Sequence, residues 1–318
     1  MISRAARMAG LSAALWLACG AISRAQLSDP PSRLAAVTSP SLVPPQDYFN
    51  NQPCYSDAAP PWDDTTWKLQ VLPDGLIYHA YLAGPKESRF ASVWAYDKNQ
   101  GWFWDSTLGG HVGILRWGTD HLFRPDGWQL DMEGAAFPRL DLENNHDLES
   151  ADFRFGIPLT YGNGPWQFKF AYYHVSSHVG DEYMISHPTF VRNNYSRDSL
   201  VLGAAFYPLD FLRLYGEVGY GFYTSGPAKP WEFQFGAELS PSMPSGLRGA
   251  PFAAINGYIR EEVDYSGSLT AQVGWQWRGA GAGQLFRVGV QYYNGPSNQY
   301  VFLNDHENYV AGALWYDF

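Results

Sequence analysis

The chain has 318 residues, enough for one large domain or two ordinary ones. Its mean hydropathy is −0.28. Outside the N-terminus no apolar run approaches about 18 residues, which excludes a helical membrane protein. A net charge of −10 leaves little basic surface to neutralise phosphates, so nucleic acid is excluded as a partner. Aromatic residues at 17% together with 32 glycines are typical of β-structure.

Residues 1–25 have the layout of a secretory signal peptide. A positive start, an apolar run and a small-residue cleavage site follow one another: Arg4 and Arg7, Met8 to Ile22, and Ser23-Arg24-Ala25. We therefore expect export and cleavage before Gln26. Only Cys54 remains after that point, so no intramolecular disulfide is expected.

Residues 26–75 form a segment rich in Pro, Ser, Asp and Asn. It shows neither the helical nor the strand period, which predicts an N-terminal extension or linker rather than a packed element. Such an extension could tether a periplasmic partner.

From about residue 88 the sequence changes to segments of about ten residues that alternate apolar and polar positions. A period of two with one apolar and one polar face is the strand pattern. Bacterial barrels have even strand counts, so residues 76–82 are placed outside the wall as a surplus thirteenth segment. The twelve predicted strands are 88–96, 103–117, 127–137, 150–161, 166–177, 197–208, 212–223, 230–239, 251–263, 268–277, 285–293 and 309–318.

The same alternation would occur in a secreted β-sandwich with its apolar face turned inward, and that alternative stays open here. Aromatic residues near the ends of apolar faces, such as Trp231 and Tyr292, favour the membrane version, because aromatic girdles lie at both interfaces of a transmembrane barrel. Charges on the polar faces suit a wet or ion-paired lumen: Arg154, Lys169, Glu217, Glu232, Arg260 and Glu262. The end Tyr316-Asp317-Phe318 resembles the C-terminal strand of bacterial outer-membrane proteins. The expected fold is an all-β, transmembrane antiparallel β-barrel of about 12 strands over residues 76–318, in the outer membrane.

One predicted strand carries residues with catalytic chemistry on its lipid side. In the stretch 166–178, Gln167 and Lys169 mark the lumen face, so His174 and Ser176 project from the opposite, aromatic face. This strand rises from a short periplasmic turn, which places both residues near the outer surface. A polar pair facing lipid is costly unless it has partners or a role.

Three residues from two strands are expected to converge at this place. On one strand face, side chains two residues apart are close enough for the His174 imidazole to take the Ser176 proton. The next strand descends from the outer surface, and its lipid face begins with Asp198. That carboxylate is positioned to orient the imidazole.

Tyr173-His174-Val175-Ser176 looks like the catalytic strand of outer-membrane phospholipase A and of the lipid A deacylases, which place His-x-Ser on the barrel exterior. The resemblance implies that His174 is the base, Ser176 the nucleophile and Asp198 the orienting group. Those families favour Asn after the serine, where this chain has Ser177, and the spacing to Asp198 is longer here. The same resemblance implies that the loop residues Asp181 and Glu182 hold calcium; the alternative is that both are solvated loop charges.

A more extensive resemblance, over the whole mature chain, is to an uncharacterised bacterial family, domain of unknown function 1207. It implies no activity. The stretches that carry it are Leu72 to Tyr78, Glu133 to Leu140, His174 to Tyr183, and Trp231 to Glu238.

Three functions follow as hypotheses. The first is an acyl-ester hydrolase acting on outer-leaflet phospholipid or lipid A, with lipid as partner and a homodimer left open. The second is a passive or substrate-specific channel, in which the inward charges either line a path or close it by pairing. The third is a structural surface barrel, in which His174, Ser176 and His178 only bond headgroups and water. No spacing among the histidines suggests zinc, and His79 and His111 are expected to be structural.

Overall fold

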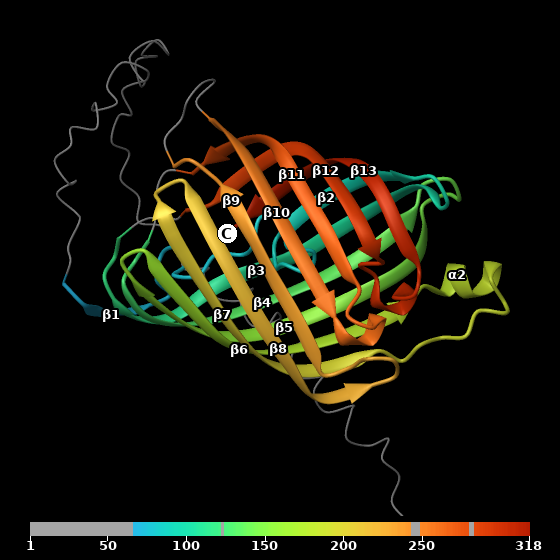
Figure 1. Ribbon diagram of the computed structural model, residues 1–318, viewed down its shortest axis with the longest axis horizontal. Coiled ribbons are helices and arrows are strands. Elements are labelled where there is room, and N and C mark those ends of the chain that lie inside the picture. Colours follow the sequence, from blue (N-terminus) through green and yellow to red (C-terminus); the bar gives the residue numbers. More distant parts are fainter. Residues whose placement is uncertain (1–65, 122–123, 243–248, 280–282) are drawn as a thin grey trace, which may run out of the picture. The chain divides into compact units, whose positions relative to one another are not determined.

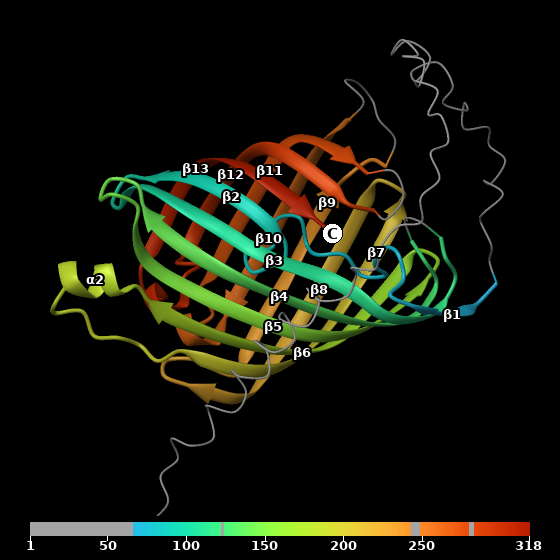
Figure 2. The ribbon, with the colours of Figure 1, turned by 180° about the vertical axis from the view of Figure 1, so that it is seen from behind.

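The structure is a computed structural model that describes residues 66–318 apart from 122–123, 243–248 and 280–282. Within these residues twelve antiparallel strands, β2 to β13, form a closed barrel (Figures 1 and 2). Each strand pairs with the next one along the chain, and β13 pairs with β2 to close the wall. The predicted signal peptide and most of the predicted extension lie outside the described residues.

The twelve predicted segments match the wall strands to within a few residues, which confirms the predicted barrel. None of the helices in the described ranges is long and apolar enough to cross a membrane. The wall strands are β2 Phe90–Asp97, β3 Gly101–Gly118, β4 Gly127–Asp141, β5 Asp147–Asn163, β6 Trp166–Val179, β7 Ser196–Leu209, β8 Leu212–Ser225, β9 Trp231–Leu239, β10 Ala250–Arg260, β11 Gly267–Arg278, β12 Leu285–Pro296 and β13 His306–Asp317.

The wall turns its apolar face outward. On β11, Leu269 and Val273 are 39% and 57% exposed, whereas Thr270, Gln272 and Gln276 are buried. A sandwich folded in water would bury the apolar face and leave the polar one exposed. The observed sidedness is that of an outer-membrane-type barrel, whose outer band is apolar and whose interior is polar.

The buried interior combines ion pairs with clusters of buried apolar and aromatic side chains, the largest of which includes Leu82, Phe252 and Trp315. The six charges predicted to face the lumen all do so, with side chains 17% exposed or less. Burying a charge is tolerated when a counter-ion lies within hydrogen-bond distance. The pairs include Lys169–Glu217 (2.5 Å), Arg154–Glu133 (2.9 Å), Arg197–Glu232 (3.1 Å), Arg213–Glu238 (3.3 Å) and Arg260–Glu262 (3.5 Å).

The largest single loss of stability is expected from Arg139→Met. Arg139 is 1% exposed and bridges Asp105 (2.7 Å) and Glu307 (2.5 Å). Its removal leaves carboxylates unpaired in the interior, which costs about 3–5 kcal/mol of unfolding free energy. Urea unfolding in lipid vesicles measures the change. The control is Arg124→Met, because this exposed pair with Asp210 is worth about 1 kcal/mol or less; equal losses in both variants would contradict the assignment.

A segment that precedes the wall strands runs through the lumen. The short strand β1 (Lys68–Val71) pairs with the last residues of β3, at the end of the barrel that also carries the short turns. Leu72 and Gly75 then adopt positive φ angles of 51° and 70°, which turns the chain off the wall. The residues from Leu76 to Arg89, here called the plug, lie inside the wall in both views (Figures 1 and 2).

The middle of the plug is locked to inward side chains of the wall. Ile77 and Tyr81 are completely buried, and the Tyr81 ring stacks on Tyr215 at 3.8 Å. The Tyr81 hydroxyl donates to Glu217 (2.9 Å), and Arg213 donates to the His79 carbonyl oxygen (3.0 Å). Residues 76–82 are not part of the wall, which confirms the prediction. Their position inside the lumen was not indicated by the sequence.

The opposite end of the barrel, here called the loop end, carries the helices α2 (Asp181–Ser186), η2 (Glu261–Val263) and η3 (Tyr300–Phe302). Figure 1 shows α2 projecting beyond the wall at this end. η3 folds inward and is buried, and the Tyr300 backbone N–H donates to Asp152 (3.2 Å). Asp152 also pairs with Lys86 of the plug at 2.6 Å, which links the loop to the plug.

Candidate active site

The lipid-side face of β6 is the face that the sequence predicted. Trp166, Phe168 and Phe170 are 43–47% exposed, whereas Gln167 and Lys169 are buried. Side chains alternate along a strand, so His174 and Ser176 belong to the outward set. The His174 side chain is 41% exposed, which confirms its outward orientation.

The register of β6 and β7 brings Asp198 to His174. The two residues are direct Cα partners in the antiparallel pair. His174 Nδ1 and Asp198 Oδ1 lie 2.7 Å apart. An ionised carboxylate only accepts hydrogen bonds, so Nδ1 carries the proton and donates it. The second ring nitrogen, Nε2, then holds a lone pair and can act as a base.

Tyr172 belongs to the site although it was not among the residues predicted from the sequence. Its hydroxyl donates to the same Asp198 Oδ1 at 2.7 Å. A second donor fixes the carboxylate in the position from which it orients His174. The signal was present in the sequence: Tyr172 shares the face of His174, and a phenol facing lipid needs a nearby acceptor.

The structure places Ser176 on the correct face but does not hydrogen-bond it to His174. Its Cα partners are Ser196 on β7 and Phe153 on β5. Ser176 is two residues from His174 on the same strand, so their Cα atoms are about 7 Å apart. Catalytic hydrogen bonds of this kind are often formed only in the substrate complex. The arrangement therefore supplies an oriented base beside a serine, with the last contact still to be made.

The predicted calcium ligands are not gathered into a site. Asp181 and Glu182 begin α2 and are both exposed. Across the described ranges, no three side chains of the His, Cys, Asp and Glu types lie where they could hold a metal ion. Calcium binding by these two carboxylates stays a prediction.

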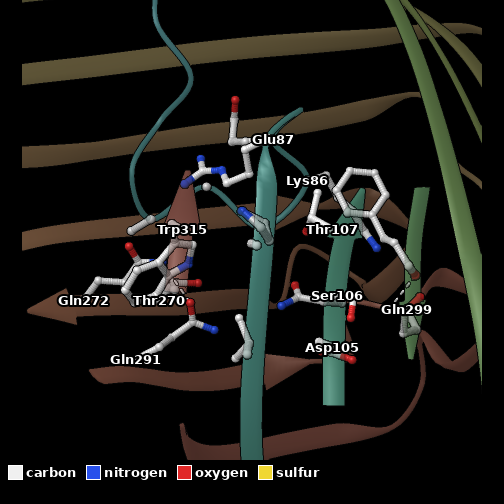
Figure 3. A pocket seen from close by; sticks show the side chains of 18 of the residues that line it. Lys86, Glu87, Asp105, Ser106, Thr107, Thr270, Gln272, Gln291, Gln299 and Trp315 are labelled. Atoms are coloured by element: carbon white, nitrogen blue, oxygen red, sulfur yellow. Dashed lines mark hydrogen bonds between the residues drawn. The ribbon is translucent and has the colours of Figure 1, made fainter. Parts of the chain in front are cut away.

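The lumen contains a small hollow between the plug and the wall (Figure 3). Lys86 and Glu87 reach it from the plug, and Gln272 and Gln291 from β11 and β12. The two glutamine side chains hydrogen-bond to each other at 2.8 Å, and Lys86 is paired with Asp152. Because these polar groups satisfy one another, the hollow belongs to the packing of the plug.

Comparisons with known proteins give a family and a set of distant barrels. A family model described as protein of unknown function (DUF1207) matches residues 42–318. No curated protein matches the chain. Among solved structures, the KdgM porin is similar with a TM-score of 0.41 and 10% identity, over 71% of this chain and 97% of that one. A calcium-bound dimer of outer-membrane phospholipase from Salmonella typhi has a TM-score of 0.47 and 12% identity, over 71% and 89%.

Proposed function

The chain belongs to the family of proteins of unknown function DUF1207, and we propose that its barrel is an acyl-ester hydrolase that acts on membrane lipid. The substrate class is an outer-leaflet phospholipid or lipid A. In this proposal Ser176 is the nucleophile, His174 the base and Asp198 the orienting group. The barrel lies in the bacterial outer membrane after removal of residues 1–25, with the loop end outside.

The observation that carries the proposal is the 2.7 Å hydrogen bond between His174 and Asp198 on the outer wall. An ionisable pair on a lipid-facing surface is costly and is kept where it has a function. The other outward residues of β6 are mostly aromatic, as expected for a strand that only contacts lipid. Tyr172 adds a second donor to the carboxylate, which is the support that a catalytic base requires.

The chemistry follows from these positions. Ser176 Oγ attacks the ester carbonyl carbon while His174 Nε2 takes the hydroxyl proton, and Asp198 stabilises the resulting imidazolium. The tetrahedral intermediate collapses, the acyl–oxygen bond breaks, and His174 returns the proton to the leaving alcohol. Water then attacks the acyl-serine with His174 again as base, which releases the fatty acid and restores Ser176.

The channel alternative is not favoured, because the plug fills the lumen and inward charges such as Lys169 and Glu217 are paired. If no lipid is cleaved, the remaining hypothesis is a structural surface barrel without enzymatic activity. A homodimer and a periplasmic partner for residues 26–75 remain predictions.

Fatty-acid release by the purified protein in detergent micelles tests the proposal. Asp198→Asn is expected to lower kcat by about 10³–10⁴-fold, because an amide no longer holds the required His174 tautomer. Tyr172→Phe keeps the carboxylate and removes one hydrogen bond, so its loss should be about tenfold. An Asp198→Asn variant as active as the wild type would remove Asp198 from the mechanism, and a wild type that releases no fatty acid would overturn the proposal.

A further inference from the structure

The lipid-side row of β6 continues beyond Ser176 to a cationic group. His178 is the next outward residue, and its ring packs against Phe153 with centroids 5.7 Å apart. The segment between α2 and β7 brings Arg192 to it, and the Arg192 guanidinium donates to His178 Nδ1 at 3.2 Å. The Cα partner of His178 on β5 is Ala151, which has a small side chain.

The charge of Arg192 is not neutralised by the parts of the chain that the structure describes. Inward arginines such as Arg139 and Arg154 pair with carboxylates, whereas Arg192 is exposed and bonded to a neutral imidazole nitrogen. A guanidinium with free donors is the group that binds phosphate oxygens in a two-bonded geometry. The adjacent Val191 is 79% exposed, so an apolar side chain lies beside this cation at the loop end.

The other direction along the same face leads to an apolar hollow on the outside of β4 to β8. It is lined by aromatic and aliphatic side chains, among them Phe168, Phe170 and Leu202. Small residues, including Ala204 and Gly216, also line it, beside the inward pair Lys169 and Glu217. A Cβ built at Gly216 would have no atom within 4 Å, so the space outside it is open.

The spacing of these features matches a lipid laid along β6. His178 is two residues from Ser176, or about 7 Å, and Phe170 is six residues away in the other direction, or about 20 Å. With a strand tilt of about 40°, 20 Å corresponds to about 15 Å of depth, which is half of the hydrocarbon core. A group 7 Å beyond the ester is at headgroup level, and a chain below it reaches the hollow.

We propose that Arg192 and His178 bind the phosphate of a diacyl glycerophospholipid whose ester lies at Ser176 and whose acyl chain enters the hollow at Gly216. This deepens the proposed function, on which it rests for the role of Ser176. The carboxylates of Asp181 and Glu182 are near in sequence and would repel a phosphate. Neither hydrogen-bonds to Arg192 or His178 in the described chain.

Binding to the Ser176→Ala protein separates this proposal from the hydrolase itself, because no turnover is needed. Native mass spectrometry in detergent counts bound phosphatidic acid and bound diacylglycerol with the same acyl chains. The expected result is at least about tenfold preference for phosphatidic acid, lost on adding Arg192→Ala, since a charge-assisted bidentate contact is worth that factor or more. The matched control is Arg124→Ala, a partly exposed arginine at the opposite end that should keep the preference.

Two further binding experiments test whether the phosphate must belong to a lipid and whether the acyl chain occupies the hollow. Inorganic phosphate at millimolar concentration should leave lipid binding unchanged; full displacement would mean a simple anion site and would overturn the lipid assignment. Gly216→Leu should weaken binding of both lipids equally by filling the hollow, and unchanged binding would overturn the acyl-chain assignment. Equal affinity for the two lipids, or an Arg192→Ala variant that keeps the preference, would overturn the phosphate site even if hydrolysis is observed.

Discussion

Replacing Ser176 with alanine is expected to reduce fatty-acid release by at least about 10⁴-fold, while the barrel stays folded. The reason is that the acyl group is transferred to Ser176 Oγ, and the oriented base His174 has no substitute nucleophile to deprotonate. The assay is fatty-acid release in mixed micelles, with folding checked by the heat-dependent shift in gel mobility that intact barrels show.

The adjacent serine supplies a matched control. Ser177 is 2% exposed and faces the interior, so it cannot reach a lipid ester. Ser177→Ala should therefore retain activity within about twofold, and any loss should follow stability only. If Ser177→Ala inactivates and Ser176→Ala does not, the sidedness on which the mechanism depends is wrong.

Replacing residues 76–83 of the plug with a Gly/Ser linker of equal length is expected to turn an electrically silent barrel into a conducting one. The replacement removes Tyr78 and Tyr81 and leaves the Arg213–Glu238 and Lys169–Glu217 pairs lining a water-filled space. A barrel of twelve strands is wide enough for small solutes when nothing fills it. Single-protein conductance in planar bilayers measures the change.

The control for this experiment is a Gly/Ser replacement of the exposed turn 142–146 between β4 and β5, which should leave the bilayer silent. Conductance of the wild type equal to that of the plug variant would contradict a closed lumen and would return the channel hypothesis to first place. Lipid hydrolysis by the plug variant should persist if the barrel refolds, because the candidate site is on the outer wall.

The strands could be predicted closely because each one must satisfy two solvents at once. One face of a wall strand contacts lipid and the other contacts a polar interior. Apolar and polar residues therefore alternate along every wall strand. The errors occur where local rules compete. The prediction ended one strand at residue 137, yet β4 continues through Pro138 to Asp141, with a register shift between Arg139 and Leu140.

The candidate site was predictable for a related reason. The faces of β6 and β7 follow from the period of two. The direction of β6 follows from the short turn before it, and β7 runs the opposite way. These two facts place Asp198 beside His174, and the structure confirms that contact at 2.7 Å. Tyr172 was missed because its bond to Asp198 runs diagonally between the strands, and a diagonal contact depends on rotamers rather than on phase.

The amino-acid sequence alone determined the barrel, its sidedness and the outward position of His174, Ser176 and Asp198, because all three follow from local periodicity. Only the tertiary structure decided that the plug enters the lumen and that Arg192 meets His178 at the loop end. Neither segment has a period, so its position depends on charged and aromatic side chains far away in the chain, such as Glu217 for Tyr81. Contacts of that kind are selected by the assembled barrel and leave no local signal.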